Sequence, residues 1–409
     1  MRILISSYAC SPFMGSEPGV GWGFVNALAK HHELWVIVEE EKFRNDIDKY
    51  VSKNPEILKS VHFYYIRKKR NRLLRKFWPP SYYWYYRQWH VDAFNLGKKL
   101  HCEVQFDLVH QLTMVGFREP GYLWKLGVPF VWGPVGGMGL FPLRFLPAMG
   151  WGGGYYLAYN VVNLWQMHFS VRPRMAARVA GKGLIAATPE NQLGALKYWG
   201  VSSALMCEVG VPQTPLKRLV VARDQNKPLR LVWTGVHVRR KALNIALRAL
   251  ATLSKDLKWE LHILGKGVLT KDWILMSKRL GIYNNCHFHY WLERSEVLKV
   301  MLDSHVMLIT SLRDLTSTVT VESLACGLPI VCLDHCGFAG VVDDTCGIKV
   351  EVTTPNQVVR DFAAAVTRLA TDEAYRQNIA HGAQQKASEL SWEQKAIDIN
   401  SIYQKKTSS

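Results

Sequence analysis

Two acidic residues, Asp314 and Glu322, lie eight positions apart in the stretch LITSLRDLTSTVTVESLACGLPIV. The apolar run 306–309 predicts a buried strand, and the hydroxyl residues 316–318 lead into a short helix that ends near Gly327. The start of a helix presents unpaired backbone N–H groups, which favour a bound phosphate. Because a carboxylate aimed at that phosphate would repel it, we expect the two acids to serve the groups on either side of it.

Glu322 lies one turn into the predicted helix, where it could accept hydrogen bonds from the hydroxyls of a ribose. Asp314 lies in the loop before the helix and would face the group beyond the phosphates. This arrangement suggests a nucleotide-sugar site. For Glu322 the alternative stays open that an acid near a helix start is simply stabilised by the helix dipole. The residues expected to present amides and hydroxyls to the phosphates are Thr316, Ser317, Thr318 and Val319.

A basic cluster lies between the predicted strand LRLVWTG and the next helix, at 239–241. Basic side chains at a helix start are unfavourable for the helix dipole. Their presence there favours a bound diphosphate over an ordinary solvated run of charge. Arg240 and Lys241 are therefore candidates to neutralise such a group.

The loop after the first predicted strand is rich in glycine and includes Gly15 and Ser16. Glycine lets a ligand approach the backbone closely, and a helix start follows the loop. A nicotinamide-dinucleotide fold would need a tighter G-x-G-x-x-G turn, but Phe24 stands at its third glycine position. The acids at 39–41 could mimic the ribose-binding acid of that fold, so this alternative stays open, although a phosphate or a sugar suits the loop better.

Neither a metal nor a cofactor is expected. Four cysteines lie near His335, but their spacing is looser than the paired spacing of zinc sites, and small buried apolar residues are the simpler interpretation. The D-x-D sequence formed by Asp46 and Asp48 falls on an amphipathic helix pattern and is expected to be a solvated face. The four cysteines are Cys326, Cys332, Cys336 and Cys346.

Apolar runs of strand length alternate with helical patterns along the whole chain. Near-continuous apolar strands separated by helices indicate parallel sheets that are covered on both faces. The alternation restarts after the polar stretch 217–228, and 409 residues suit two domains. We therefore predict an α/β fold of two doubly wound, Rossmann-like domains, residues 1–213 and 214–409, that face each other across a cleft.

The net charge of +18 calls for an anionic partner, such as phosphorylated substrates, anionic lipid or nucleic acid. Residues 67–90 carry eight Lys or Arg, eight aromatic residues and no acid. This composition favours peripheral contact with an anionic membrane, and nucleic acid is the less favoured partner because no nucleic-acid motif accompanies it. The uncharged run 145–167 contains Pro147 and three consecutive glycines, which disfavours a spanning helix and favours an interfacial or cleft-lining segment.

The segment 311–331 resembles the acid-x7-acid signature of the retaining glycosyltransferases of family four, the glycosyl transferases group 1, of the bacterial polysaccharide type. That family has the GT-B fold, and the resemblance implies that the last helix packs back on the N-terminal domain. Further resemblances are GSEPGVGW (15–22), DLVH (107–110), RRKAL (239–243), LGKG (264–267) and GFAGVVDDTCGIKV (337–350).

The resemblance assigns roles to individual residues. Glu322 would bind the donor ribose, the amides of Thr318 and Val319 would bind the phosphates, and Gly265 would line the donor site. Lys241 and Arg240 would neutralise the leaving diphosphate, and Asp314 would contact the transferred sugar.

This chain departs from the family at three places. Asp314 stands where the family usually has Glu, and Val236 stands where it often has Arg. The turn GPVGG replaces a common histidine-bearing turn, which leaves His110, Gly136 and Gly137 as candidates to line the acceptor side.

The implied reaction moves a hexose-type sugar from a nucleoside-diphosphate sugar to a glycan or lipid-linked acceptor, with retention of configuration, in cell-surface polysaccharide or lipopolysaccharide synthesis. No secretory signal is recognised at the start of the sequence, so we expect a cytoplasmic protein that contacts the inner face of the plasma membrane. Two other classes stay open: a nucleotide-sugar epimerase or hydrolase on the same fold, and a non-catalytic protein that binds membrane or nucleic acid.

Overall fold

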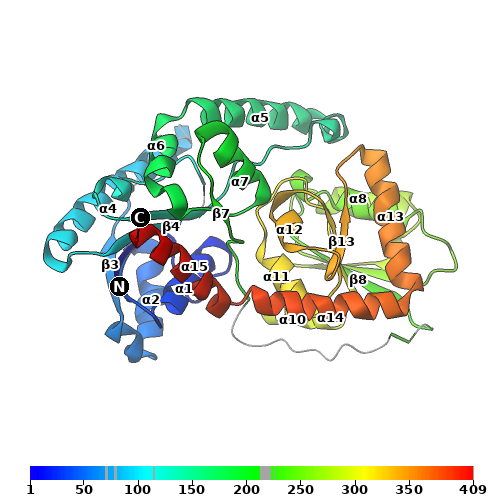
Figure 1. Ribbon diagram of the computed structural model, residues 1–409. Coiled ribbons are helices and arrows are strands. Elements are labelled where there is room, and N and C mark those ends of the chain that lie inside the picture. Colours follow the sequence, from blue (N-terminus) through cyan, green and yellow to red (C-terminus); the bar gives the residue numbers. More distant parts are fainter. Residues whose placement is uncertain (70–71, 78–80, 114–115, 212–222, 225, 409) are drawn as a thin grey trace. The chain divides into compact units, whose positions relative to one another are not determined.

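The structure is a computed structural model that describes residues 1–69, 72–77, 81–113, 116–211, 223–224 and 226–408. The chain forms two compact units (Figure 1). We call residues 1–138, 164–210 and 392–409 the N-terminal unit, and residues 139–163 and 211–391 the C-terminal unit. Each unit contains one parallel sheet, which confirms the predicted α/β fold with two Rossmann-like sheets.

In the described part of the N-terminal unit, the sheet has the strand order β3-β2-β1-β4-β5-β6-β7. Strand β1 is buried from its second residue onward, because helices cover both faces of the sheet. The strands are β1 (Arg2–Ser7), β2 (Glu33–Glu39), β3 (Val61–Ile66), β4 (Leu108–Thr113), β5 (Phe130–Val135), β6 (Leu184–Ala186) and β7 (Ala204–Leu205).

The last helix of the chain, α15 (Trp392–Thr407), belongs to the N-terminal unit and packs against α1 (Ser16–Leu28). A Cβ atom on Gly23 would lie 2.3 Å from the Trp392 ring, and one on Gly210 would lie 2.6 Å from it. These two glycines therefore make room for the indole. The other helices of this unit are α2 (Glu40–Val51), α3 (Arg72–Phe77), α4 (Ser81–Val104), α6 (Val171–Ala180) and α7 (Pro189–Gly194).

In the described part of the C-terminal unit, the sheet has the order β10-β9-β8-β11-β12-β13, with parallel pairs throughout. Figure 1 shows α8 and α13 beside this sheet. The strands are β8 (Leu229–Thr234), β9 (Trp259–Leu264), β10 (Cys286–Tyr290), β11 (Val306–Ile309), β12 (Ile330–Leu333) and β13 (Gly347–Val350). The helices are α8 (Leu243–Leu250), α9 (Thr270–Arg279), α10 (Arg294–Leu302), α11 (Thr318–Ala325), α12 (Cys336–Val341), α13 (Pro355–Thr371) and α14 (Glu373–Glu389).

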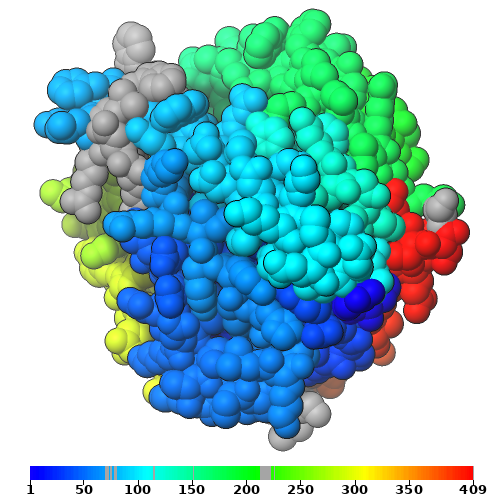
Figure 2. All heavy atoms as spheres, turned by 90° about the vertical axis from the view of Figure 1, so that its left-hand side faces the viewer, coloured from blue at the N-terminus to red at the C-terminus, as the bar shows by residue number. Residues whose placement is uncertain are grey.

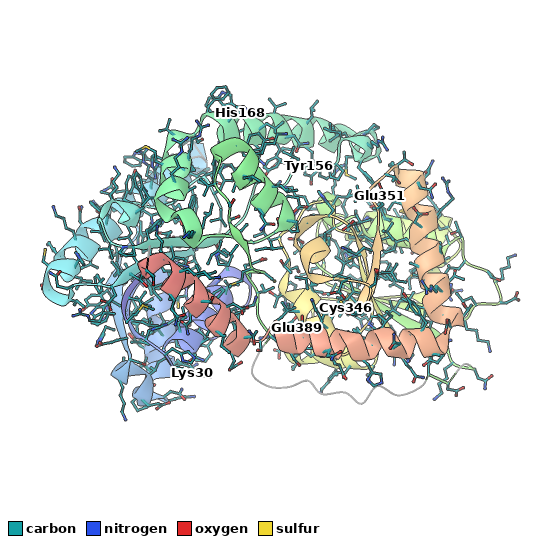
Figure 3. The ribbon with its side chains drawn as sticks, in the orientation of Figure 1. Lys30, Tyr156, His168, Cys346, Glu351 and Glu389 are labelled. Atoms are coloured by element: carbon teal, nitrogen blue, oxygen red, sulfur yellow. The ribbon has the colours of Figure 1, made fainter. Side chains whose placement is uncertain are left out.

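Residues 139–163 lie in the C-terminal unit, although the boundary predicted at 213 puts them in the first domain. The reason is packing: Phe141 and Tyr156, of which Figure 3 labels Tyr156, are buried in the core of the C-terminal unit. Their rings stack with centroids 4.1 Å apart. Asn160 accepts a hydrogen bond from the N–H of Phe141 and donates one to its carbonyl oxygen, both at 2.8 Å. A domain boundary predicted from the order of strands and helices cannot show that residues 139–163 pack in the C-terminal unit.

Helix α5 (Trp151–Phe169) runs from this segment back into the N-terminal unit. Among the helices of the described residues, none is long and apolar enough to cross a membrane. Short 3-10 turns occur at η1 (Pro55–Lys59), η2 (Leu123–Lys125), η3 (Leu143–Phe145), η4 (Pro147–Met149), η5 (Gly181–Gly183), η7 (Arg239–Lys241) and η8 (Tyr283–Asn285), and a π-helical turn, η6, at Ala195–Trp199.

Candidate active site

The loops after β8 and β9 approach each other closely at the carboxyl edge of the second sheet. Gly265 follows β9 with a φ of +109°, and a Cβ atom on it would lie 2.1 Å from the carbonyl oxygen of Gly235. Only glycine fits both this φ and this contact. Gly265 thus lets the two loops pack together, and its backbone stays at the edge where open α/β sheets bind ligands.

Asp314 and the two candidate cations meet at this edge. The Lys241 ammonium forms an ion pair with Oδ2 of Asp314, and Arg240 Nη1 lies 3.4 Å from Oδ1. Arg240 also donates a hydrogen bond to the carbonyl oxygen of Arg313 at 3.0 Å. The pairing follows from the topology, since β8 and β11 are neighbours and their following loops share one edge.

The third cation of the basic cluster faces a different partner. Arg239 donates a hydrogen bond to the carbonyl oxygen of Met149 at 2.6 Å. The Arg313 guanidinium lies 3.5 Å from the centroid of the Tyr159 ring, within cation–π range. Residues 139–163 therefore support the loops that carry Arg240 and Asp314. Sequence reasoning missed Arg313 and Tyr159, because their contact joins segments far apart in the chain.

Helix α11 begins where the phosphate position was predicted. Ser317 precedes the helix with a φ of +72°, and Thr318 and Val319 of the first turn are partly exposed. No acidic residue lies in that first turn. Thr316 differs from its neighbours because it is fully buried, and a Cβ atom on Gly337 would lie 2.3 Å from its hydroxyl oxygen. The partly exposed positions of this junction are thus Ser317, Thr318 and Val319, whereas burial keeps the Thr316 hydroxyl from the phosphate contact that the sequence predicts for it.

Glu322 lies on the next turn of α11 and is almost fully buried. Its Oε1 atom accepts two hydrogen bonds from Arg294, one from Nε at 3.1 Å and one from Nη2 at 2.8 Å. Burial raises the pKa of the Glu322 carboxyl, and the Arg294 charge opposes that shift. Sequence reasoning missed Arg294, for which the only available signal was a basic residue at the start of the helix before β11.

The remaining predicted site residues belong to the N-terminal unit. Gly15 and Ser16 are exposed at the start of α1, and Ser16 has a φ of +57°. Gly136 and Gly137 follow β5, with Gly137 at a φ of +90°. These four positions are backbone turns at the ends of buried strands or helices, as the glycine content predicts.

His110 is fully buried inside the N-terminal unit. Its Nδ1 atom lies 2.6 Å from the hydroxyl of Tyr403 on α15, and its Nε2 atom lies 2.8 Å from the carbonyl oxygen of Gly133. Burial lowers the pKa of the imidazole to about 4, so the ring is neutral near pH 7. This geometry suits a histidine that ties α15 to the sheet.

The residues weighed as metal ligands have other partners. Asp46 accepts a hydrogen bond from the Ser11 hydroxyl at 2.5 Å, and Asp48 lies 3.4 Å from Arg44 Nε. The Cys336 sulfur accepts a hydrogen bond from the backbone N–H of Asp314 at 3.2 Å. Cys326, Cys332 and Cys346 are fully buried as well, and Cys336 is nearly so.

The comparison with protein families matches a part of the chain that lies within the C-terminal unit. Residues 221–386 match the model of the family described as glycosyl transferases group 1. The lipopolysaccharide glucosyltransferase WaaG of Escherichia coli K12 is 26% identical over 155 residues, which cover 37% of this chain and 41% of that protein. The match thus spans less than half of this curated relative.

Two solved structures resemble the whole chain. One is the apo form of the lipopolysaccharide outer core galactosyltransferase WaaB, with a TM-score of 0.64, 16% identity and coverage of 99% of this chain and 100% of that one. The other is Anabaena Alr3699/HepE in complex with UDP-glucose, with a TM-score of 0.56, 14% identity and coverage of 100% and 99%. Residues 221–386 therefore form a domain of the glycosyl transferases group 1, and the chain as a whole has the two-domain GT-B fold.

Proposed function

We propose that this protein is a retaining glycosyltransferase that moves a hexose-type sugar from a nucleoside-diphosphate sugar to a glycan or lipid-linked acceptor. The observation that carries this proposal is the cluster of Arg240, Lys241 and Asp314 beside the start of α11, within the matched domain. Two cations and a set of helix N–H groups suit a diphosphate, and Glu322 lies one turn further along the same helix.

The chemistry asked of these residues is mainly the stabilisation of charge. As the bond between the sugar and the diphosphate breaks, negative charge grows on the departing phosphate, where Lys241, Arg240 and the first turn of α11 would stabilise it. Asp314 would lie near the sugar, whose positive character grows at the same time. Since two fixed cations supply the charge, we propose that this step needs no metal ion.

The first donors to test are uridine diphosphate hexoses. The name of WaaG describes it as a glucosyltransferase of lipopolysaccharide, and HepE has been solved with UDP-glucose. These similarities support a hexose donor and an acceptor in cell-surface polysaccharide synthesis for this chain.

We further propose that the protein works in the cytoplasm and touches the inner face of the plasma membrane through residues 67–90. In the described part of this stretch, four large apolar side chains are exposed, together with Lys76 and Arg87. Figure 2 looks onto the side of the N-terminal unit that α2 and α4 cover. Basic residues attract anionic lipid and exposed aromatic rings favour the interface. The four are Leu73, Phe77, Tyr83 and Trp84.

The test combines binding and turnover. Thermal-shift measurements with a panel of nucleoside diphosphates and nucleotide sugars identify the donor, and Glu322→Ala serves as the control for the site. Turnover of that donor is then measured with and without glycan and lipid-linked acceptors, and NMR of the product gives its anomeric configuration. Consumption of donor without any acceptor would instead identify an epimerase or a hydrolase, and a folded protein that binds none of the panel would refute the proposal.

Membrane contact is tested separately by co-sedimentation with phosphatidylserine-containing vesicles. Neutralising Arg67 and Lys69, which are exposed, is expected to release the protein, because each Lys or Arg near such a surface contributes about 1 kcal/mol. Lys68 is left unchanged because it is buried. Co-sedimentation that is unchanged by these substitutions would contradict the assignment of this surface.

A further inference from the structure

Four side chains with metal-binding chemistry lie on one face of two neighbouring strands. Glu260 and His262 alternate along β9, and His287 and His289 alternate along β10. The parallel register places His287 opposite His262, so the period of two puts all four on the same side. The intervening residues Leu261 and Ile263 of β9 are buried in the core on the opposite face.

The atoms that could bind a cation converge. One ligand atom each from Glu260, His262 and His287 lies within 4.8 Å of the others. His262 Nε2 is 3.2 Å from Oε1 of Glu260, and His287 Nε2 is 3.6 Å from Oε2. Ligand atoms around a tetrahedral zinc ion with bonds of about 2.0–2.2 Å lie roughly 3.3–3.6 Å apart. The two separations are close to this range but reach different oxygens of Glu260, so a small rotation of the carboxylate toward His262 would bring all three ligands around one ion.

A second layer of contacts orients these groups. His262 Nδ1 lies 2.9 Å from His289 Nε2, which directs the other ring nitrogen of His262 toward Glu260.

Arg230 is the competing cation at this cluster. Its Nε atom lies 2.8 Å from Oε1 of Glu260, and its Nη2 atom lies 3.3 Å from Nε2 of His262. The Arg230 side chain is one-third exposed, so its guanidinium has room to turn toward solvent and keep only Oε1. The Oε2 atom of Glu260 and the Nε2 atom of His262 would then face the cation.

We propose that Glu260, His262 and His287 bind one first-row divalent cation, for which zinc is the best fit. Two imidazoles and one carboxylate are ligands that zinc takes readily, and the exposure of His287 gives the ion access from solvent. His289 acts as a positioning residue. His262, the ligand nearest to Gly265 along β9, precedes it by three residues of extended chain, roughly 10 Å, and lies on a face of the sheet, whereas the candidate active site lies at its carboxyl edge.

The test uses the full chain after treatment with a chelator, titrated with Zn²⁺ alone by isothermal titration calorimetry. One equivalent is expected to bind, and His287→Ala is expected to weaken it at least tenfold. His381→Ala is the matched control, because His381 is also an exposed histidine of the C-terminal unit and lies on α14, outside this cluster. That variant should bind zinc like the unaltered chain.

Cobalt provides a second measurement that does not depend on calorimetry. Co²⁺ bound by the three ligands is expected to give the strong visible absorption of a four-coordinate site, which His287→Ala should abolish and His381→Ala should keep. Circular dichroism confirms that each variant is folded. The proposal is overturned if the chain binds no equivalent of zinc, or if His287→Ala binds zinc and cobalt as the unaltered chain does. Neither readout depends on sugar transfer.

Discussion

Replacing Glu322 with glutamine tests the role of the buried acid on α11 most directly. The substitution removes one charge and almost no volume. Oε1 of Glu322 accepts both hydrogen bonds from Arg294, so Oε2 is the oxygen left to accept a bond from a ribose hydroxyl. In the variant the amide oxygen is expected to stay with Arg294. The NH₂ group would then face the ligand in place of a charged acceptor.

The size of the effect follows from the bond that is lost. A hydrogen bond to a charged group contributes about 1.5–3 kcal/mol, which corresponds to a change in Kd of roughly 10- to 150-fold. The loss should fall on ligands that carry a ribose. Inorganic pyrophosphate has no ribose, and its affinity should change by less than about threefold, because Glu322 lies one turn beyond the N–H groups that would hold it.

Calorimetric titration of UDP and of pyrophosphate into both proteins separates these effects. Glu351→Gln is the matched control, since it is the same substitution at an exposed acid of the same unit (Figure 3). The reasoning is refuted if Glu322→Gln weakens pyrophosphate as much as UDP, because the acid would then act through the fold of the helix. Unchanged UDP binding would refute it as well.

Four further predictions concern the same two units. Lys241→Met should weaken pyrophosphate and UDP equally, at least tenfold by calorimetry, because the lysine would meet the phosphates that both ligands share. His110→Phe should lower the free energy of unfolding by about 2–4 kcal/mol in urea, because it leaves two buried polar partners unpaired, while nucleotide affinity stays unchanged. Gly265→Ala should lower the free energy of unfolding by about 2–4 kcal/mol, and Gly281→Ala by about 1 kcal/mol. Both glycines have a positive φ, but only a Cβ atom added to Gly265 would collide with backbone atoms. Burial raises the pKa of Glu322, so the native state keeps the proton of this carboxyl to higher pH than the unfolded chain does. The free energy of unfolding, relative to that of Glu322→Gln, should therefore fall as the pH rises from the unfolded-state pKa to the native one. Urea unfolding from about pH 4 upward measures this.

Much of the fold could be predicted from the sequence, because parallel strands buried on both faces appear as continuous apolar runs. The runs at 2–7 and 306–309 are strands of the two sheets. The contact between Asp314 and Lys241 could also be predicted from the sequence. Both residues follow strands of one sheet, and the carboxyl ends of parallel strands share an edge.

Other features depend on contacts that no local pattern records. Nothing in the local pattern of residues 139–163 marks a change of unit, yet Phe141 and Tyr156 are buried in the core of the C-terminal unit. His110 follows the pattern of a strand-end histidine, but its environment is set by Tyr403, almost three hundred residues away. Periodicity and spacing describe neighbours in the chain, and these positions are decided by neighbours in space.

Asp314 and Glu322 show how contacts between distant segments neutralise charges that would otherwise repel a phosphate at the start of α11. Neither carboxylate could remain unpaired beside a helix start that suits a phosphate, because like charges would repel. Each has a cation from another part of the same sheet: Lys241 follows β8 and pairs with Asp314, and Arg294 follows β10 and pairs with Glu322. A diphosphate that binds there would compete with Asp314 for Lys241 and leave the pair of Glu322 and Arg294 intact. Donor binding is therefore expected to break only the ion pair of Lys241 with Asp314. The unfavourable free energy of breaking that pair would arise beside the transferred sugar.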